Sequence, residues 1–386
     1  MLKKERLFTP GPTALHPEVI RALAKPIIHH RTDEFRGMLK SCSQGLKDFF
    51  RTSDDVLVLA SSGTGAMEAA IVNLLSPGDK MLALVAGNFG ERWAGLGKAY
   101  GMNVQVLEAA WGEAVSAEAV ATALDRDPEI KAVFVQLSES STGACHDIEA
   151  IAKVTRNKPN TLLVVDAISG AGAMKLETEA WGVDVVVVGS QKALALPPGL
   201  AFISASARAW ERIEASKSPR FYFDLRKEKK SQANGETAFT PAISHVVALK
   251  AALDFIESLG GVTKLVANAG TLAGMTRAAG QALGLPFVSP KAFGDALTAL
   301  YPPSGIDSGA IVKGLKSEFS STVAGGQGAL KGKIFRVAHL GYYDTTDILG
   351  LIGTLEIILH KLGHKFDLGK GIAAAEQEYI RRTAAQ

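Results

Sequence analysis

Cysteine is nearly absent from this chain of 386 residues. Its two cysteines, Cys42 and Cys145, lie far apart and outside any Cys-x-x-Cys spacing, which indicates neither a zinc site nor a disulfide framework. The sequence also lacks an apolar run close to the length of a membrane span, and residues 1–6 are not followed by the apolar segment of a signal peptide. We therefore expect a cytoplasmic protein with no membrane partner.

An excess of one charge sign is missing as well. The 42 Lys and Arg residues and the 39 Asp and Glu residues give a formal net charge of +3, with acids and bases mixed along the chain. This balance predicts neither nucleic acid nor an anionic membrane as a partner. The strongest charge cluster, residues 226–230, is short and contains an acid, and we interpret it as a solvated loop.

Two motifs that would carry other chemistry are incomplete. His360 and His364 lie four apart on the predicted closing helix, but Lys361 takes the place of a metalloprotease glutamate, so we expect no metal site. Gly95-Leu96-Gly97 is similar to the start of a dinucleotide fingerprint, yet it lies inside a helical stretch and Tyr100 stands where the last glycine belongs. These gaps argue against a metalloprotease and against a nucleotide-dependent dehydrogenase.

The length of the chain favours two domains, because it exceeds what one ordinary core holds. Three prolines and a glycine in residues 8–17 predict a stiff entry arm, which we place at residues 1–17. We predict a large domain over residues 18–255 and a smaller C-terminal domain over residues 256–386. The long helical pattern of residues 243–259 is the predicted bridge between them.

Short apolar segments rich in β-branched residues recur through the first half of the chain. They are residues 56–60, 81–86, 132–136, 161–166 and 183–188. Dense runs of this kind are typical of strands that are buried on both faces. In open α/β sheets ligands bind at the carboxyl ends of the strands, so the residues that follow these segments are the candidates for a functional site.

A lysine and an aspartate follow two of these strands. Gly189-Ser190 ends the strand of residues 183–188, so that Lys192 stands just past its carboxyl end, and Asp166 closes the strand of residues 161–166. This pair predicts pyridoxal phosphate as cofactor. Lys192 would form a Schiff base with it, and Asp166 would hold the pyridine nitrogen protonated.

Three further strand ends carry residue types that the same cofactor would use. Residues 61–65 form a small-residue turn that opens a helix, which is typical of a phosphate site, and no Lys-Ser/Thr follows as in a Walker loop. Phe89 is placed to stack on a planar ring. The hydroxyls of residues 138–142 would reach a phenolate or a substrate carboxylate, or cap the next helix. Each feature alone is typical of ordinary turns and cores, and their convergence favours the cofactor site.

Arg336 lies among apolar neighbours in the alternating strand pattern of residues 333–338. A buried arginine is costly unless it is paired, and its planar fork fits a carboxylate. The partner would be a substrate or an internal acid. His29-His30-Arg31, beside the entry arm, is a candidate for a second anion site.

These segments together resemble one family, the class V aminotransferases of the fold-type I pyridoxal phosphate enzymes, and within it the alanine–glyoxylate and serine–glyoxylate (serine–pyruvate) group. The matching residues are 10–13, 30–31, 34–35, 62–68, 139–143, 165–167, 189–193, 197–199 and 335–337, which span nearly the whole chain. The resemblance implies an α/β fold, with a mostly parallel, seven-stranded sheet flanked by helices in the large domain and a smaller α+β C-terminal domain.

The resemblance also implies roles for single residues. Catalytic roles fall on Lys192 and Asp166, cofactor contacts on Gly63, Thr64, Gly65, Phe89, Ser140, Asp166, Gln191, Lys192 and Thr240, and substrate contacts on Gly11 and Arg336. Thr240 would reach the phosphate of a neighbouring subunit, which implies a homodimer with sites completed across the interface. The chain departs from the family at Phe89, where tryptophan is frequent, and at Thr64, where some members carry histidine.

The expected reaction is the transfer of an amino group from alanine or serine to glyoxylate or pyruvate by a ping-pong mechanism. The alternatives are a transaminase for aspartate, phosphoserine or an aminophosphonate, and a related lyase in which Cys42 or Cys145 supplies sulfur chemistry. A third alternative is a structural or regulatory subunit that retains the fold without catalysis. Intact Lys192, Asp166 and Arg336 argue against this last possibility.

Overall fold

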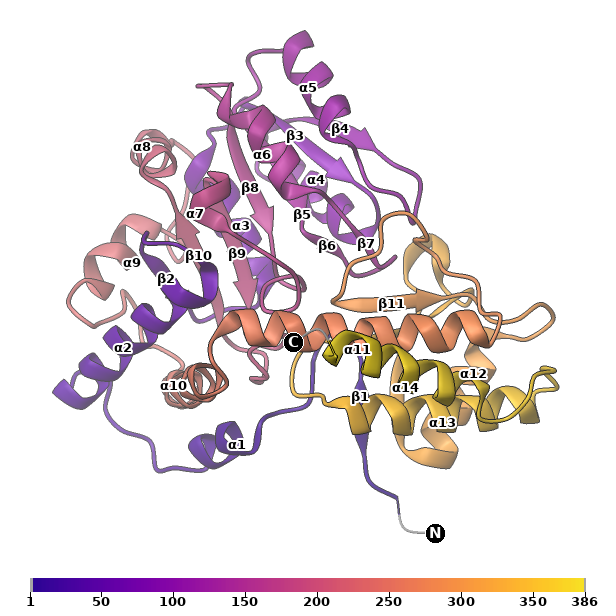
Figure 1. Ribbon diagram of the computed structural model, residues 1–386. Coiled ribbons are helices and arrows are strands. Elements are labelled where there is room, and N and C mark those ends of the chain that lie inside the picture. The colour runs from indigo at the N-terminus through magenta and orange to yellow at the C-terminus, as the bar shows by residue number, and fades with distance from the viewer. Residues whose placement is uncertain (1–2, 385–386) are drawn as a thin grey trace.

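A seven-stranded sheet forms the centre of the large part of the molecule in the computed structural model, which describes residues 3–384 (Figure 1). In spatial order its strands are β2 (Val56–Leu59), β10 (Ala201–Ala205), β9 (Val185–Gly189), β8 (Leu162–Asp166), β5 (Ala132–Gln136), β3 (Lys80–Val85) and β4 (Asn103–Glu108). Only β10 runs antiparallel to its neighbours in this sheet. The predicted mostly parallel α/β sheet is thus confirmed.

Helices cover both faces of this sheet, because successive side chains of a buried strand point to opposite faces. On β9, Val185 and Val187 belong to one hydrophobic core, whereas Val186 and Val188 belong to another. The first core includes α3 (Gly63–Leu74), α4 (Asn88–Ala99) and α8 (Ala207–Ala215), and the second includes α2 (Asp33–Phe50), α5 (Ala117–Arg126), α6 (Ile148–Arg156) and α10 (Ile243–Ser258). The valine-rich strands therefore have no polar face.

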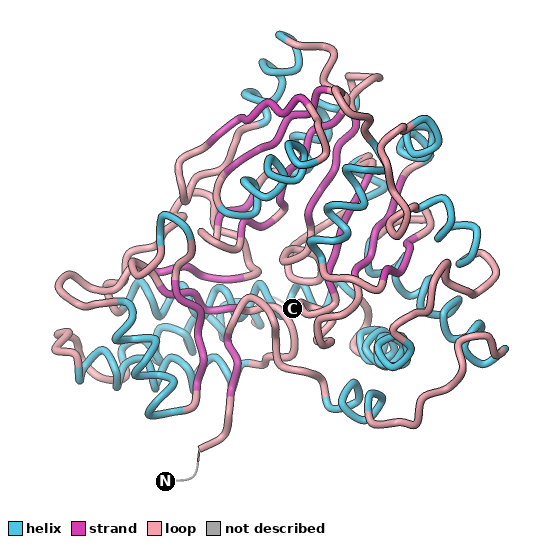
Figure 2. The backbone as a smooth tube through the Cα atoms, turned by 180° about the vertical axis from the view of Figure 1, so that it is seen from behind, coloured by secondary structure: helices cyan, strands magenta, loops and turns pink. Residues whose placement is uncertain are grey.

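A second sheet, of four strands, joins the N-terminal arm to the C-terminal part of the chain. The strand β1 (Arg6–Phe8) pairs in parallel with β12 (Ser321–Gly325), and β13 (Phe335–Ala338) lies antiparallel between β12 and β11 (Leu297–Leu300). Around it lie α11 (Val262–Ala282), α12 (Ser308–Phe319), α13 (Thr345–Lys361) and α14 (Lys370–Thr383). Figures 1 and 2 show these elements beside the seven-stranded sheet from opposite sides. The boundaries near residues 17 and 255 stay a prediction.

The charged residues 226–230 are not a loop, contrary to our interpretation. They lie in the helix α9 (Leu225–Gln232). Asp224 stands before this helix, and its side chain accepts a hydrogen bond from the backbone N–H of Arg226. An acidic N-cap of this kind stabilises a helix start, which the charge pattern alone does not reveal.

The two C-terminal histidines do not share a helix, so that expectation is also wrong. His360 lies in the last turn of α13, whereas His364 follows the end of that helix. Gly363, at φ = 90°, lies between them and leaves the right-handed helical conformation. Across residues 3–384, no group of three or more His, Cys, Asp or Glu side chains is arranged to hold a metal ion.

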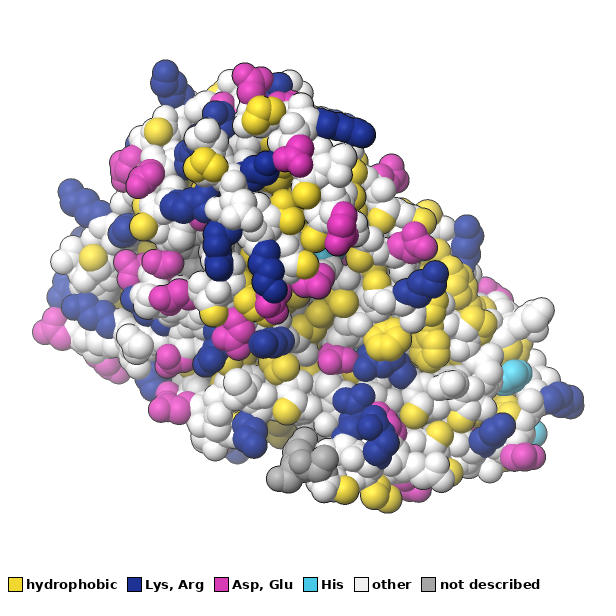
Figure 3. Space-filling view, turned by 45° about the horizontal axis from the view of Figure 1, so that its top comes forward, with side chains coloured by type: hydrophobic (Ala, Val, Ile, Leu, Met, Phe, Trp, Pro, Cys, Tyr) yellow, Lys and Arg dark blue, Asp and Glu magenta, His cyan; other side chains and the backbone are white. Residues whose placement is uncertain are grey.

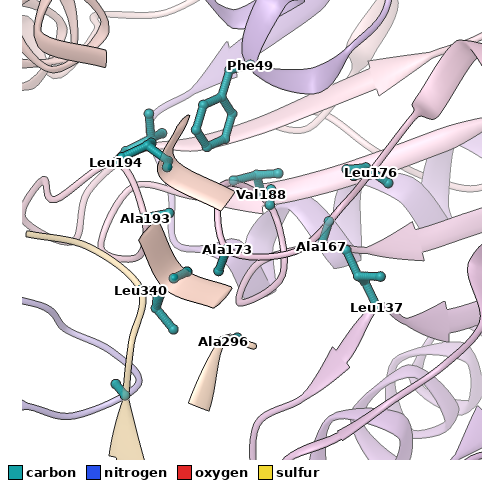
Figure 4. Packing of buried hydrophobic residues seen from close by; sticks show 14 of the residues in the cluster. Phe49, Leu137, Ala167, Ala173, Leu176, Val188, Ala193, Leu194, Ala296 and Leu340 are labelled. Atoms are coloured by element: carbon teal, nitrogen blue, oxygen red, sulfur yellow. The ribbon is translucent and has the colours of Figure 1, made fainter. Parts of the chain in front are cut away.

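Residues that directly follow the predicted catalytic positions pack against the C-terminal part of the chain. Ala167 and Ala193 belong to the same hydrophobic core as Ala296 and Leu340, and Figure 4 shows Ala193 beside Leu340 and Ala167 beside Leu137. Loss of such contacts would leave cavities, which cores tolerate poorly. The loops after β8 and β9 are therefore held against the smaller part of the molecule.

Charges of both signs are intermixed on the face in Figure 3, and hydrophobic side chains gather toward the right of that view. None of the helices described between residues 3 and 384 is long and apolar enough to cross a membrane.

Candidate active site

Strand ends of the large sheet and one strand of the small sheet supply the predicted site residues. Asp166 is the last residue of β8, Lys192 follows the end of β9 by three residues, and Ser140 follows the short strand β6 (Ser138–Glu139), which comes just after β5. Arg336 lies on β13 of the other sheet, and its Nη1 donates a hydrogen bond to the carbonyl oxygen of Ser140. Parts that are distant in sequence thus meet at one place between the two sheets.

Lys192 is buried between the large sheet and the N-terminal arm, with 9% of its surface exposed. Its Nζ donates to the carbonyl oxygen of Pro10, and the Thr13 hydroxyl donates to the Lys192 carbonyl oxygen at 2.9 Å. Burial lowers the pKa of Lys192 to about 8, against the opposing effect of the Asp166 charge. A larger fraction of this amine is therefore neutral near pH 7 than for an ordinary lysine, and the neutral form is the nucleophile.

Asp166 lies on the neighbouring strand and is 5% exposed. Its Oδ1 accepts a hydrogen bond from the backbone N–H of Ile168 at 2.8 Å. Burial raises the pKa of Asp166 to about 7. A nearby cation stabilises the charged form of a buried carboxylate, and a protonated ring nitrogen would be such a cation.

Gly11 of the arm lies so close to Lys192 that a side chain would not fit. Its φ of 137° is rare for other residues, and a Cβ built on it would lie 2.4 Å from the Lys192 Nζ. The arm reaches the lysine because this residue is glycine. Its substrate contact, which the family resemblance implied, stays a prediction.

We expect Gly11→Ala to lower kcat/KM by about 10²-fold, since the new methyl group displaces either the arm or the lysine and small misplacements of reacting groups are costly. Steady-state kinetics of the purified variant measures this. Gly78→Ala is the matched control, because Gly78 also has a positive φ, of 89°, but nothing lies within 4 Å of its Cβ position. Equal losses in the two variants would show that backbone strain alone is responsible.

The turn before α3 has the properties of an anion site. Ser62, the N-cap, makes no side-chain capping hydrogen bond, and no acidic residue lies in the first turn of this helix. The first N–H groups of α3, beginning at Gly63, are thus left for a ligand at the positive end of the helix dipole. The next two residues of the turn, Thr64 and Gly65, are half-buried.

Gln191 lies beside this turn. A Cβ built on Gly189 would lie 3.2 Å from Gln191 Oε1 and 3.6 Å from the Cα of Gly63. The Oε1 atom is buried and has no hydrogen-bond partner within residues 3–384. Because rotation of an amide exchanges its oxygen and its NH₂ group, Gln191 can present donors to a phosphate. An unsatisfied amide beside uncapped N–H groups fits a cofactor phosphate.

Phe89, the proposed ring-stacking residue, is half-buried in the first turn of α4. The carboxylate of Glu139 accepts hydrogen bonds from the backbone N–H groups of Phe89 at 3.0 Å and Gly90 at 3.1 Å, and from the Ser141 hydroxyl at 2.6 Å. Glu139 is fully buried. It therefore fixes the start of α4 to the loop that carries Ser140, a role that we missed although Glu139 lies in a matched segment.

Arg336 is 4% exposed. Its hydrogen bonds go to the backbone carbonyl oxygens of Ser140 and Gly325, and among the described residues its guanidinium forms no ion pair. Burial lowers the pKa of Arg336 to about 10, while the charge of Glu139 raises it. An internal carboxylate partner, the alternative left open by the sequence, is not found within residues 3–384. The guanidinium is thus available to a bound carboxylate.

Thr240 and the histidine segment lie apart from this cluster in the single chain. Thr240 is exposed and lines a surface pocket together with Ala60 and Tyr222. Arg31 is also exposed, and its charge acts on the surface residue Glu236. The role of Thr240 at the site of a neighbouring subunit and the role of residues 29–31 as a second anion site stay predictions.

The two cysteines are poorly placed for the sulfur chemistry of the lyase alternative. Cys42 is buried, and burial raises its pKa to about 12. Burial also raises the pKa of Cys145, which is partly exposed. Because the thiolate is the reactive form, neither cysteine is activated.

The fold and this site define a pyridoxal phosphate enzyme of the α/β type. A buried lysine with a lowered pKa lies beside a buried aspartate at the ends of adjacent parallel strands, and an uncapped helix start lies close by. These residues fit the cofactor.

The family model described as "Aminotransferase class-V" matches residues 7–283. The chain therefore belongs to the class V aminotransferases and is a pyridoxal phosphate-dependent transaminase, which confirms the resemblance seen in the sequence. Residues 95–97, discounted above as a dinucleotide fingerprint, lie within α4 as expected.

Several relatives are similar over almost their whole length. The "Soluble hydrogenase 42 kDa subunit" of Anabaena cylindrica is 41% identical and covers 97% of this chain and 99% of the relative. The "L-aspartate--glyoxylate aminotransferase" of Paracoccus denitrificans is 36% identical, and the match covers 100% of this chain and 98% of the relative. The "Serine--glyoxylate aminotransferase" of Arabidopsis thaliana is 33% identical, and the match covers 96% of this chain and 94% of the relative.

Solved structures agree with the fold. The aspartate aminotransferase of subgroup IV from Thermus thermophilus has a TM-score of 0.87 and 36% sequence identity, covering 93% of this chain and 100% of that one. Three of these four proteins are named as aminotransferases, with different substrates in their names, whereas the Anabaena relative is named as a hydrogenase subunit.

Proposed function

We propose that this transaminase transfers the amino group of alanine or serine to glyoxylate or pyruvate. The observation that carries the proposal is Arg336, a buried guanidinium that forms no ion pair within the described chain and so fits a substrate with one carboxylate. Two relatives whose names include glyoxylate support this acceptor. The free cysteines Cys42 and Cys145 support the expected cytoplasmic location.

In the proposed mechanism Lys192 would hold pyridoxal phosphate through its amine, which a substrate amine could replace. Bound pyridoxal phosphate supplies an electron sink for the charge that develops at the substrate Cα. The Lys192 amine would act as the base that takes the proton from the substrate Cα and gives it back, and its lowered pKa suits a base near neutral pH. Asp166 would hold a proton on the ring nitrogen. Water would supply the carbonyl oxygen of the keto acid that is released, and the second keto acid would accept the amino group in the reverse order.

Arg336 orients the substrate in this scheme. Its fork binds the α-carboxylate and directs the Cα–H bond toward Lys192, while the arm around Gly11 limits the access of water. The hydrogen bond from Arg336 to Ser140 joins the small sheet to the loop after β5. Substrate binding therefore acts on both parts of the site.

Aspartate is the second candidate donor. The names of the Paracoccus relative and of the Thermus enzyme both contain it. A second carboxylate needs a second cation, and the exposed Arg31 is the residue proposed from the sequence. Phosphoserine and aminophosphonates would need the same site.

Kinetics with several donors separates these candidates. We expect kcat/KM for alanine or serine with glyoxylate or pyruvate to exceed that for aspartate, and Arg31→Ala to leave the order unchanged. Lys25→Ala, which also removes an exposed cation, is the control. A preference for aspartate above about tenfold, roughly 1.4 kcal/mol of differential transition-state binding, that is lost in Arg31→Ala would overturn the choice of substrate.

We also propose a homodimer in which Thr240 completes the site of the partner. Its exposure in the single chain supports this arrangement, because an exposed side chain is free to contact another subunit.

Mixing inactive subunits tests this dimer. Lys192→Ala and Thr240→Ala chains are each expected to be impaired, and their heterodimer regains one intact site of its two, so random mixing restores about a quarter of wild-type activity. Activity and cofactor occupancy are measured before and after exchange. A monomer that is active at assay concentration, or a mixture no more active than its parents, contradicts the arrangement.

A further inference from the structure

Arg92, which the sequence patterns did not single out, lies in the first part of α4 between two proposed cofactor contacts. Its Nη1 donates a hydrogen bond to the Thr64 hydroxyl at 2.9 Å. Its Cζ lies 4.7 Å from the centroid of the Phe89 ring. The guanidinium thus touches both the turn that starts α3 and the residue proposed to stack on the cofactor ring.

The charge of Arg92 is directed at the site and has no acidic partner. The side chain is half-buried, and no carboxylate lies within ion-pair distance of it in the part of the chain that the structure describes. Burial raises the pKa of Asp166 and lowers that of Lys192, and the charge of Arg92 slightly opposes the first shift and adds to the second. We therefore expect a bound anion to stabilise this partly desolvated cation, which has no counter-ion.

We propose that Arg92 binds the phosphate group of pyridoxal phosphate, together with Thr64 and the first N–H groups of α3. The turn of residues 61–65 contains no cation of its own, although the phosphate brings close to two negative charges. A guanidinium has five donors in a planar fork that matches phosphate oxygens, and Thr64 uses one of them. Arg92 can therefore pair with the phosphate while it keeps the hydroxyl contact.

The competing role for Arg92 is a clamp on the side-chain carboxylate of an acidic substrate. The contact with Thr64 favours the phosphate, because Thr64 lies at the uncapped helix start and not at the small sheet that carries Arg336. The inference rests on the proposed position of the phosphate at this turn. It does not depend on whether alanine, serine or aspartate is the donor.

Two cofactor forms test the proposal by equilibrium binding to the cofactor-free protein. We expect Arg92→Gln to raise the Kd for pyridoxal phosphate by about 10- to 100-fold, as for lost hydrogen bonds to a charged group, and to leave the Kd for pyridoxal, which lacks the phosphate, within about twofold. Arg92→Lys is expected to recover part of the loss. Lys98→Gln, an exposed cation in the last turn of the same helix, is expected to change neither constant.

Each other outcome overturns the proposal. An unchanged Kd for pyridoxal phosphate, or equal losses for both forms with no recovery in Arg92→Lys, excludes a phosphate contact. An unchanged Kd with a raised KM for aspartate assigns Arg92 to the substrate instead. Thr64→Val tests the premise: if it discriminates between the two forms and Arg92→Gln does not, the phosphate position stands and the role of Arg92 fails. Alanine and serine turnover, measured separately, tests the proposed function.

Discussion

Lys192→Ala is expected to lower turnover by about 10⁴-fold while the protein stays folded. Two functions are lost together, the covalent attachment of the cofactor and the transfer of the Cα proton, and a positioned acid–base group alone contributes about 10²- to 10⁴-fold. The residue lies in a site and not in the hydrophobic core, and the buried Asp166, which loses a nearby positive charge, can take up a proton because burial raises its pKa to about 7. Single-turnover and steady-state kinetics measure the loss.

Lys264→Ala is the control for this variant, because Lys264 is exposed at the start of α11. Circular dichroism and thermal unfolding of both variants are expected to match the wild type closely. Turnover of Lys192→Ala near the wild-type rate would remove the lysine from the mechanism.

Arg336→Met is expected to lower kcat/KM for alanine by about 10²- to 10⁴-fold. The variant loses two charge-assisted hydrogen bonds to the substrate carboxylate, each worth roughly 1.5–3 kcal/mol, and each 1.36 kcal/mol is a factor of about ten in rate. Arg336→Lys keeps a charge but not the fork and should recover only part of the loss. The measurement is steady-state kinetics with a saturating acceptor.

Ethylamine separates carboxylate binding from damage to the fold, since it has the amine of alanine but no carboxylate. Its slow reaction is expected to be nearly the same in the wild type and in Arg336→Met. A loss as large for ethylamine as for alanine would mean that Arg336 holds the loop of Ser140 in place and does not bind the substrate.

Local patterns were sufficient to predict the central strands and their ends. The strand β5 matches the predicted residues 132–136. As predicted, Asp166 is the last residue of its strand, and Lys192 lies just past the end of another. Such positions depend on a few consecutive residues, because the apolar run, the glycine that ends it and the next polar residue are neighbours in sequence.

Contacts between distant segments could not be predicted from these patterns. Arg336 and Ser140 are 196 positions apart, and no periodicity relates them. The pairing of β1 with β12, which brings the N-terminal arm into the sheet of the C-terminal part, is equally non-local. The sequence predicted a carboxylate-binding role for Arg336 but not its hydrogen-bond partners.

Arg92 was missed for a related reason. It lies inside a helix with an amphipathic pattern, where an arginine is usually solvated. Only the packing of α4 beside α3 brings its guanidinium within hydrogen-bond distance of Thr64. Residues 226–230 show a related case, since Asp224, which caps the start of their helix, lies outside the charged run.

Borohydride reduction of the cofactor-loaded protein, followed by peptide mapping with mass spectrometry, tests the central claim most directly. The reduction makes the bond between the cofactor and its lysine permanent, so the modified residue can be identified without reference to any substrate. We predict that the added mass is found on the peptide containing Lys192, and that the visible absorption band of the loaded protein disappears on reduction. Modification of a different lysine, or no modification of a protein that has bound the cofactor, would contradict the assignment of Lys192.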